Sequence, residues 1–200
     1  MGKPPLAGAA LIALSTVAAA HASIQTEFVM TAQPEIQGLV YNVWEMKVTT
    51  DTDWTNSRLD VALTQGGMYQ SGFDPFASWR CWVFAFPPGP EIIFDTYVDV
   101  PGECPVRPSL AGAQVMTDTE IGLSWFDTRD TGSGTFLIAQ ITLTEDAKGA
   151  ISGTSYDIDT AGVGVPIERL WIDRGVIVPE PAILILLAVG APLLRRAHSR

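Results

Sequence analysis

The sequence predicts an all-β protein, a single two-sheet antiparallel β-sandwich, and three observations lead to this prediction. Between residues 23 and 178, apolar residues recur at every second position in short segments, which is the period of a strand with one buried face. Clusters of Gly, Pro and Asp separate these segments. No stretch of this region has the apolar period of an amphipathic helix. Short strands joined by such turns are typical of sandwiches and barrels.

The strand pattern can be followed along the chain. Residues 24–37 lead into the first strands, and residues 51–57 are expected to form a polar loop that contains Trp54. The expected strands are residues 40–49, 58–64, 79–86, 91–100, 120–126, 135–144, 150–158 and 168–178. The residues expected to face inward are Val40, Trp44, Met46, Val48, Leu59, Val61, Leu63, Ile121, Leu123, Trp125, Leu137, Ala139, Ile141 and Leu143.

The first 22 residues predict a signal peptide, expected as a short helix. Lys3 supplies a positive start, and residues 6–20 form an apolar run. Ala20 and Ala22 are small residues at the two positions that a signal peptidase recognises, so cleavage is expected before Ser23. A chain with this leader is exported through the inner membrane.

The last 22 residues have three parts. They are the triplet Pro179, Glu180 and Pro181, an uncharged apolar run over residues 182–194, and a basic end with Arg195, Arg196 and Arg200. As a helix, the apolar run would cover about 20 Å, which is short beside a hydrocarbon core about 30 Å thick. Arginines after such a segment are expected to stay with anionic headgroups on the cytoplasmic side.

This tail, residues 179–200, resembles the PEP-CTERM sorting signal of Gram-negative bacteria. The resemblance covers only the tail and implies recognition by an exosortase, a membrane-embedded cysteine transpeptidase that cuts near the triplet. It further implies transient anchoring by the hydrophobic helix, then delivery to the cell surface, outer envelope or exterior. Members of the family are commonly associated with exopolysaccharide or biofilm matrix, and many are glycosylated. Residues 1–22, 23–178 and 179–200 are therefore the expected signal peptide, β-sandwich domain and sorting signal.

The expected domain is strongly acidic. The whole chain holds 12 Lys and Arg and 22 Asp and Glu residues, a net charge of −10. Four of the basic residues and one acidic residue lie in the terminal segments, which leaves eight basic and 21 acidic residues, a charge near −13, over residues 23–178. Such a surface disfavours nucleic acid, because phosphate binding needs Lys and Arg patches. It favours solubility and leaves room for divalent cations.

Histidine is restricted to the two ends of the chain. His21 and His198 are the only two, one in the expected leader and one in the tail. The domain between them therefore lacks the base of a Ser-His-Asp or Cys-His site and any His ligand for zinc. This pattern predicts that the protein is not an enzyme. The remaining catalytic alternative is a hydrolase that uses a pair of carboxylates.

Three further sets of residues are candidates for a structural or binding role. Cys81 and Cys104 are the only cysteines of an exported chain, so a disulfide is expected. Asp157 and Asp159 are two apart in an expected strand and could begin a calcium site, although turn carboxylates are usually just solvated. Trp54, Trp82 and Phe84 could stack on sugar rings, and the alternative for these aromatic residues is core packing.

Together these features predict an exported structural or interaction protein of the cell surface or extracellular matrix. The alternatives are a carbohydrate- or calcium-binding module and a carboxylate-dependent hydrolase. The expected partners are signal peptidase, exosortase, and exopolysaccharide or other surface proteins, with no nucleic acid. In outline the sandwich is expected to be cohesin-like or immunoglobulin-like, a comparison of architecture that carries no function.

Overall fold

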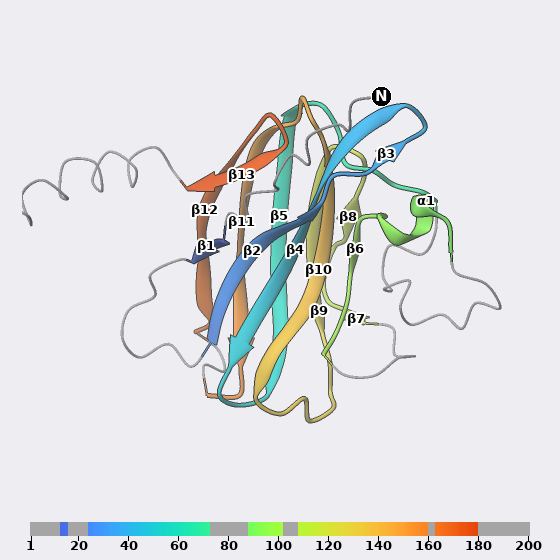
Figure 1. Cartoon of the computed structure of the whole chain (residues 1–200). Helices are drawn as coiled ribbons and strands as arrows, with labels where there is room; N and C mark the ends of the chain where they lie inside the picture. Colours follow the sequence, from blue (N-terminus) through green and yellow to red (C-terminus); the bar gives the residue numbers. More distant parts are fainter. Residues whose placement is uncertain (1–12, 16–23, 73–87, 102–107, 160–162, 180–200) are drawn as a thin grey trace, which may run out of the picture.

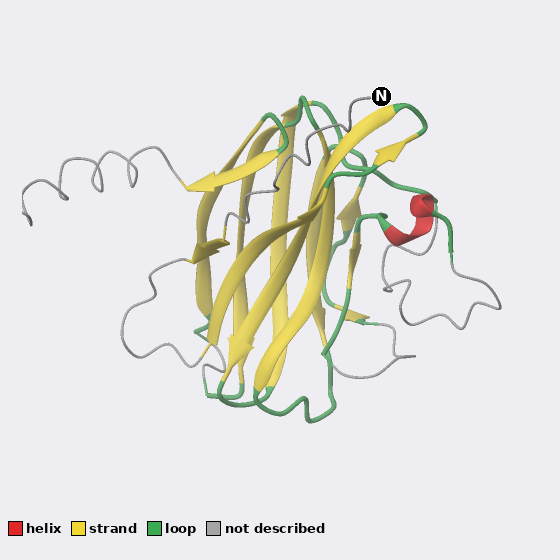
Figure 2. Cartoon of the chain, in the orientation of Figure 1, coloured by secondary structure: helices red, strands yellow, loops and turns green. Residues whose placement is uncertain are grey.

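The computed structural model describes residues 13–15, 24–72, 88–101, 108–159 and 163–179. Within these ranges the chain forms two antiparallel sheets that pack face to face (Figures 1 and 2), and the described helix is the short α1, Pro90–Ile93. The predicted all-β, two-sheet sandwich is confirmed. The helices expected at the two ends are not shown, because residues 180–200 and most of the leader lie outside the described residues.

One sheet has six strands, with β4 and β10 at its centre. Its order is β1 (Ala13–Ser15), β2 (Ile24–Ala32), β4 (Leu39–Thr50), β10 (Gly134–Thr144) and β6 (Tyr97–Val98), and β3 (Glu35–Ile36) also pairs with β4. Three residues of the expected leader thus form a strand beside β2. In the described part of the chain, no helix is long and apolar enough to cross a membrane.

The other sheet has seven strands, with β11 and β5 near its centre. Its order is β13 (Val176–Pro179), β12 (Val165–Asp173), β11 (Lys148–Asp157), β5 (Trp54–Gln65), β9 (Glu120–Phe126) and β7 (Ser109–Leu110), and β8 (Val115–Met116) also pairs with β9. The chain crosses from one sheet to the other after β4, β5, β6, β9 and β10. Consecutive segments of the chain therefore lie on both sides of one core.

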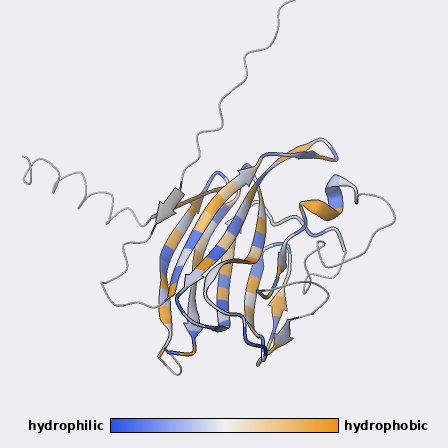
Figure 3. Ribbon diagram, turned by 60° about the horizontal axis from the view of Figure 1, so that its bottom comes forward, coloured by the Kyte–Doolittle hydropathy of each residue, from blue (hydrophilic) through white to orange (hydrophobic). Residues whose placement is uncertain are grey.

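The predicted inward faces form the core between the sheets. Figure 3 shows apolar and polar bands alternating along the strands. The buried residues confirmed from the alternation are Trp44, Met46, Val48, Leu59, Val61, Ile121, Leu123, Trp125, Ala139, Ile141 and Leu143. Val40 was predicted wrongly, because it is 37% exposed and lies where β4 pairs with the short β3. Leu63 is half-buried and packs against the core.

A bulge in β10 overturns one further prediction. The pairing of β10 with β4 shifts between Leu137 and Ala139, so that an extra residue enters β10. An extra residue reverses which side chains face the core. Phe136 and Ile138 therefore pack on the core on one side of the bulge, and Ala139 does so on the other, whereas Leu137 is left half-buried outside the core cluster.

Two predicted strands have a different structure. Within residues 91–100, the chain forms α1 and then the two-residue β6, because Pro90 suits the first helical turn. Residues 168–178 form the end of β12 and most of β13, which a tight turn joins. Arg174 and Gly175 have φ of 52° and 68°, as a two-residue type I′ hairpin requires. Residues 79–86 lie outside the described residues.

The segment 51–57 was also predicted wrongly as a loop, since β5 begins at Trp54. Trp54 is buried, and its Nε1 donates to Ser57 Oγ at 3.0 Å. Ser57 Oγ lies 3.0 Å from Ser155 Oγ, and Thr50 Oγ1 donates to Asp157 Oδ2 at 3.2 Å across the two sheets. These bonds satisfy polar groups that would otherwise cost free energy inside the core.

Gly175 provides a test of the β12–β13 hairpin. A Cβ there would lie 2.5 Å from Thr144 O and 2.6 Å from Asn42 Nδ2, at a φ that side chains disfavour. We expect Gly175→Ala to lower the free energy of unfolding by about 3 kcal/mol. Gly132 has a φ of 70° with nothing within 4 Å of its Cβ position, so Gly132→Ala should cost only about 1 kcal/mol. Urea denaturation measures both values, and equal losses would contradict this account of the turn.

Asp95 is a buried carboxylate beside α1. Its Oδ1 accepts hydrogen bonds from the backbone N–H groups of Ser71 and Thr96, at 2.8 and 2.9 Å, and its Oδ2 accepts one from Ser71 Oγ at 2.5 Å. Burial raises the pKa of Asp95 above its ordinary value, and these hydrogen bonds only partly oppose that effect. The folded protein therefore binds the Asp95 proton more tightly than the unfolded chain does.

The raised pKa predicts a pH dependence of stability. Because the folded state holds the Asp95 proton more tightly, the contribution of this group to stability increases as the pH falls through its raised pKa and is lost as the pH rises. We expect the unfolding free energy of wild type minus that of Asp95→Asn to increase from neutral to mildly acidic pH. Denaturant titrations at several pH values measure this difference. A difference that stays constant or falls on acidification would contradict the prediction.

Candidate functional site

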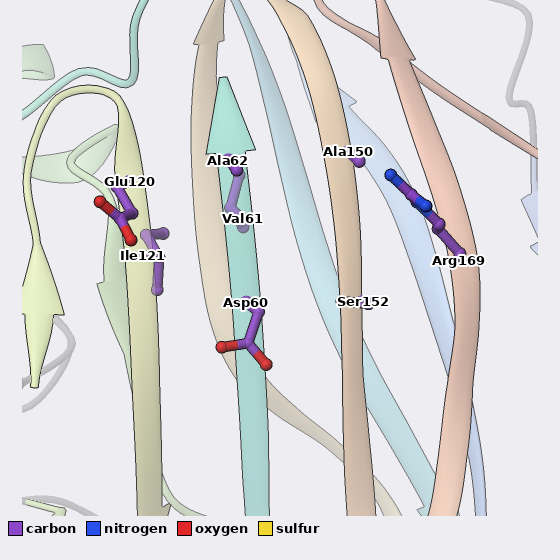
Figure 4. Close-up of a pocket in the computed structure, with 8 residues that line it drawn as sticks. All are labelled: Asp60, Val61, Ala62, Glu120, Ile121, Ala150, Ser152 and Arg169. Atoms are coloured by element: carbon purple, nitrogen blue, oxygen red, sulfur yellow. The ribbon is translucent and has the colours of Figure 1, made fainter. Parts of the chain in front are cut away.

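The outer face of the seven-stranded sheet carries an open hollow of about 290 Å³. Its outward side chains come from the four adjacent strands β9, β5, β11 and β12 (Figure 4). They are Glu120, Asp60, Ala62, Ala150, Ser152 and Arg169. At this size, the hollow lies just below the usual range of ligand pockets, about 300 to 1,000 Å³.

Strand alternation explains why these side chains face solvent. In β5, Leu59 and Val61 are buried in the core, so Asp60 and Ala62 project from the opposite side. In β9, the burial of Ile121 places Glu120 on the same outer face. The core residues of the sandwich thus determine which residues line the hollow.

The registers of the four strands place these residues in two rows across the sheet. The first row is Glu120, Ala62, Ala150 and Trp171, each paired with the next. The second row begins with Gly122, Asp60 and Ser152. Because neighbouring strands are about 4.8 Å apart, Glu120 and Trp171 mark the two sides of a face about 14 Å wide.

A bulge in β12 completes the second row. Ile151 pairs with Leu170 and Gly153 pairs with Ile167, so Glu168 and Arg169 both stand opposite Ser152. Bulges of this kind redirect a side chain. The Arg169 guanidinium lies 5.0 Å from the ring centroid of Trp171, within the range of a cation–π contact. Trp171 is 39% exposed, so the bulge presents both a cation and an indole face to solvent.

Carboxylates occupy the opposite side of the hollow. Asp60 accepts hydrogen bonds from Arg58 Nε and Nη2, both at 2.7 Å, and these bonds raise the pKa of Arg58. Glu120 lies on the next strand (Figure 4). The hollow therefore has hydrogen-bond acceptors on β5 and β9, donors on β12, and small side chains between them. This arrangement suits binding of a polar partner.

The structure corrects two of the sites predicted from the sequence. Trp54 has no exposed surface, so it cannot stack on a ligand at the surface. Asp157 is buried at the end of β11, whereas Asp159 is exposed in the following turn, so the two carboxylates do not share a face. The proposed beginning of a calcium site is therefore wrong. Within the described ranges, no three or more His, Cys, Asp and Glu residues gather to hold a metal ion.

Most other predicted site residues lie outside the described residues. They are Cys81 and Cys104 of the expected disulfide, Trp82 and Phe84, the cleavage-site residues Ala20, Ala22 and Ser23, and Glu180, Pro181, Arg195, Arg196 and Arg200 of the tail. The first residue of the triplet is described. Pro179 is the last residue of β13 and pairs opposite Leu170.

The sequence did not select the charged residues of the hollow, Asp60, Glu120 and Arg169, or the neighbouring Trp171. Alternation alone could have placed Asp60 and Glu120 on an outer face, because each neighbours a predicted inward residue. The sequence did not reveal the register of the four strands, because that register is known only from the strand pairing. The bulge at Arg169 also has no local sequence signal.

Comparison with known proteins gives no relative from which a function could be carried over. The chain matches no protein-family model, no curated protein and no solved structure. The residues and their geometry are therefore the basis for a function.

Trp125 and Trp171 allow a buried tryptophan to be compared with an exposed one. Trp125 is fully buried, and its Nε1 donates to Asp99 O at 2.7 Å. We expect Trp125→Ala to lower the unfolding free energy by about 3 to 5 kcal/mol. Trp171→Ala should cost no more than about 1 kcal/mol, because it removes an exposed side chain. Denaturation curves measure both, and a loss at Trp171 as large as that at Trp125 would assign it to the core.

Proposed function

We propose that the chain is an exported, non-catalytic interaction protein of the cell surface or extracellular matrix, delivered there by its C-terminal tail. The observation that carries this proposal is the order of the tail, with Pro-Glu-Pro, an apolar run and arginines within residues 179–200. The leader over residues 1–22 supports export. The proposed route runs through the inner membrane, with signal peptidase and an exosortase as processing partners.

The fold supports a separation between the β-sandwich domain and the proposed sorting segment. Pro179 is both the first residue of the triplet and the last residue of β13, the final described strand. The proposed sorting segment thus begins at the end of the last described strand.

The described carboxylates support binding and folding more than catalysis. Asp60 has both oxygens engaged by Arg58, and buried Asp95 is held by Ser71 and Thr96. A carboxylate-dependent hydrolase needs two carboxyl groups with separate acid and base roles in one cleft. The acceptors and donors on opposite sides of the hollow instead suit recognition of a partner.

A second candidate is a carbohydrate-binding module, and one observation favours it. Trp171 is partly exposed beside the hydrogen-bonding groups of the hollow. An indole face with adjacent polar groups is a suitable platform for a sugar ring. This candidate now rests on Trp171, since Trp54 is buried.

Processing of the tail tests the proposal. We expect intact-mass measurement of protein recovered from the cell exterior to show the loss of residues 1–22 and of the arginine-containing end. A double variant, Glu180→Ala with Pro181→Ala, should remain with the cell membrane, because it removes two residues of the triplet and leaves Pro179 in β13. Glu35→Arg, on the distant β3, is a control that should be released like wild type. Recovery outside the cell of protein that still holds residues 195–200 would refute the sorting proposal.

A further inference from the structure

We propose that the outer face of the seven-stranded sheet is a self-complementary surface that binds a second copy of the chain. The inference names the partner for the proposed interaction function and rests on that function for its biological setting. Two identical faces meet about a two-fold axis, so every contact occurs twice. The order of residues across the two rows makes the face complementary to itself.

The required axis lies between β5 and β11, parallel to the strands and within the interface. Rotation about this axis places β12 of each copy over β9 of the other, and β11 over β5. The rows are preserved, because the rotation does not move residues along the strand direction. Each residue can therefore be matched with the residue that it would face.

The charges on this face match under that rotation. Arg169 lies on β12 and Glu120 on β9, one row apart, which is about 7 Å along the strand. Long side chains cover this offset, so two equivalent Arg–Glu pairs form. Asp60 faces Ser152 of the second copy, and the Asp60 of that copy lies one strand away in the same row, where Arg58 of each copy pairs with its own Asp60 carboxylate. Complementary charges of this kind select a partner and its orientation.

The shapes match as well. The small side chains Ala62, Ala150 and Ser152 leave room between the sheets for the long side chains of the rims. Gly122 lies in the second row, opposite Arg169 of the second copy. Its φ is not positive, and a Cβ there would meet nothing closer than Val115 Cβ at 3.7 Å. The monomer therefore does not require glycine at this position, whereas the Arg169–Trp171 pair of a second copy would use the open space.

Basic residues on this face reduce the repulsion between two acidic chains. The domain between residues 23 and 178 has a net charge near −13, so two copies repel one another in most orientations. Three of its eight basic residues, Arg58, Lys148 and Arg169, are exposed on this sheet. These cations offset part of the repulsion that a second acidic chain meets at this face.

The edges of the face are apolar, and its size indicates a weak dimer. Val178 of β13 pairs opposite Trp171, and Val115 of β8 pairs opposite Gly122, so the rotation lays the β13 edge over the β8 edge. A third row, Ser124, Arg58 and Thr154, lies beside the second. From β13 to β8 the face is about 24 Å wide, and the three rows are about 20 Å tall, so each copy would bury on the order of 500 Å². A standard interface buries about 800 Å² per partner, which predicts a concentration-dependent association.

Charge reversal tests the proposal. Protein purified from cells that express the full chain is studied by sedimentation velocity at concentrations up to about 1 mM. We expect wild type to shift from monomer to dimer with concentration. Arg169→Glu and Glu120→Arg should each weaken the association at least about tenfold, because like charges then meet twice. An equimolar mixture of the two variants should regain the association, since each substituted position faces the opposite charge.

Two more variants separate the interface from the fold. Gly122→Val should weaken the association more than it lowers the unfolding free energy, since valine suits a strand and its Cβ makes only ordinary van der Waals contacts in the monomer. Glu35→Arg, a matched charge reversal on β3, should associate like wild type. A wild type that stays monomeric throughout, or a variant mixture that does not associate, overturns the proposal. Binding of cellohexaose that Arg169→Glu abolishes, in a monomeric wild type, would assign the face to a saccharide. Association is measured on purified protein, so it fails or succeeds independently of tail processing.

Discussion

The register between β5 and β11 is the constraint on which both faces of the seven-stranded sheet depend. Two glycines of β11 hold it. A Cβ on Gly149 would lie 2.1 Å from Ala62 O, and one on Gly153 would lie 2.2 Å from Arg58 O, so the two backbones meet more closely than any side chain allows. A slip by one residue would bring a side chain into this contact and would also turn Leu59 from the core to solvent.

This one register determines the interior and the exterior together. On the inner side it brings Ser57 and Ser155 to 3.0 Å, where they complete the hydrogen bonding of the Trp54 indole and bury no unpaired hydroxyl. On the outer side the same pairing sets Ala62 beside Ala150 and creates the floor of the hollow. The core and the candidate site are therefore two consequences of a single alignment, and neither can shift without the other.

The sequence predicted what depends on local period and missed what depends on pairing. Alternation placed Trp44, Leu123 and their neighbours in the core, because a strand with one buried face shows a period of two. It failed at Leu137, since the β10 bulge reverses the alternation, and at Trp54, whose polar neighbours disguise the start of β5. The hollow could not be predicted for the same reason. Glu120 and Arg169 belong to strands that only the tertiary fold brings into one sheet.

The β12–β13 hairpin links the two proposals physically. Trp171 of the proposed interface pairs opposite Val178, and Leu170 pairs opposite Pro179, the first residue of the proposed sorting triplet. The backbone around Gly175 anchors this hairpin to the other sheet, because Trp44 Nε1 donates to Gly175 O at 3.0 Å. Trp171 and Pro179 thus lie on one hairpin at an edge of the seven-stranded sheet. A processing enzyme that separated β13 from β12 to reach the Pro-Glu-Pro triplet would also disturb the outer face around Trp171. We therefore expect processing of the tail to leave the β12–β13 hairpin paired.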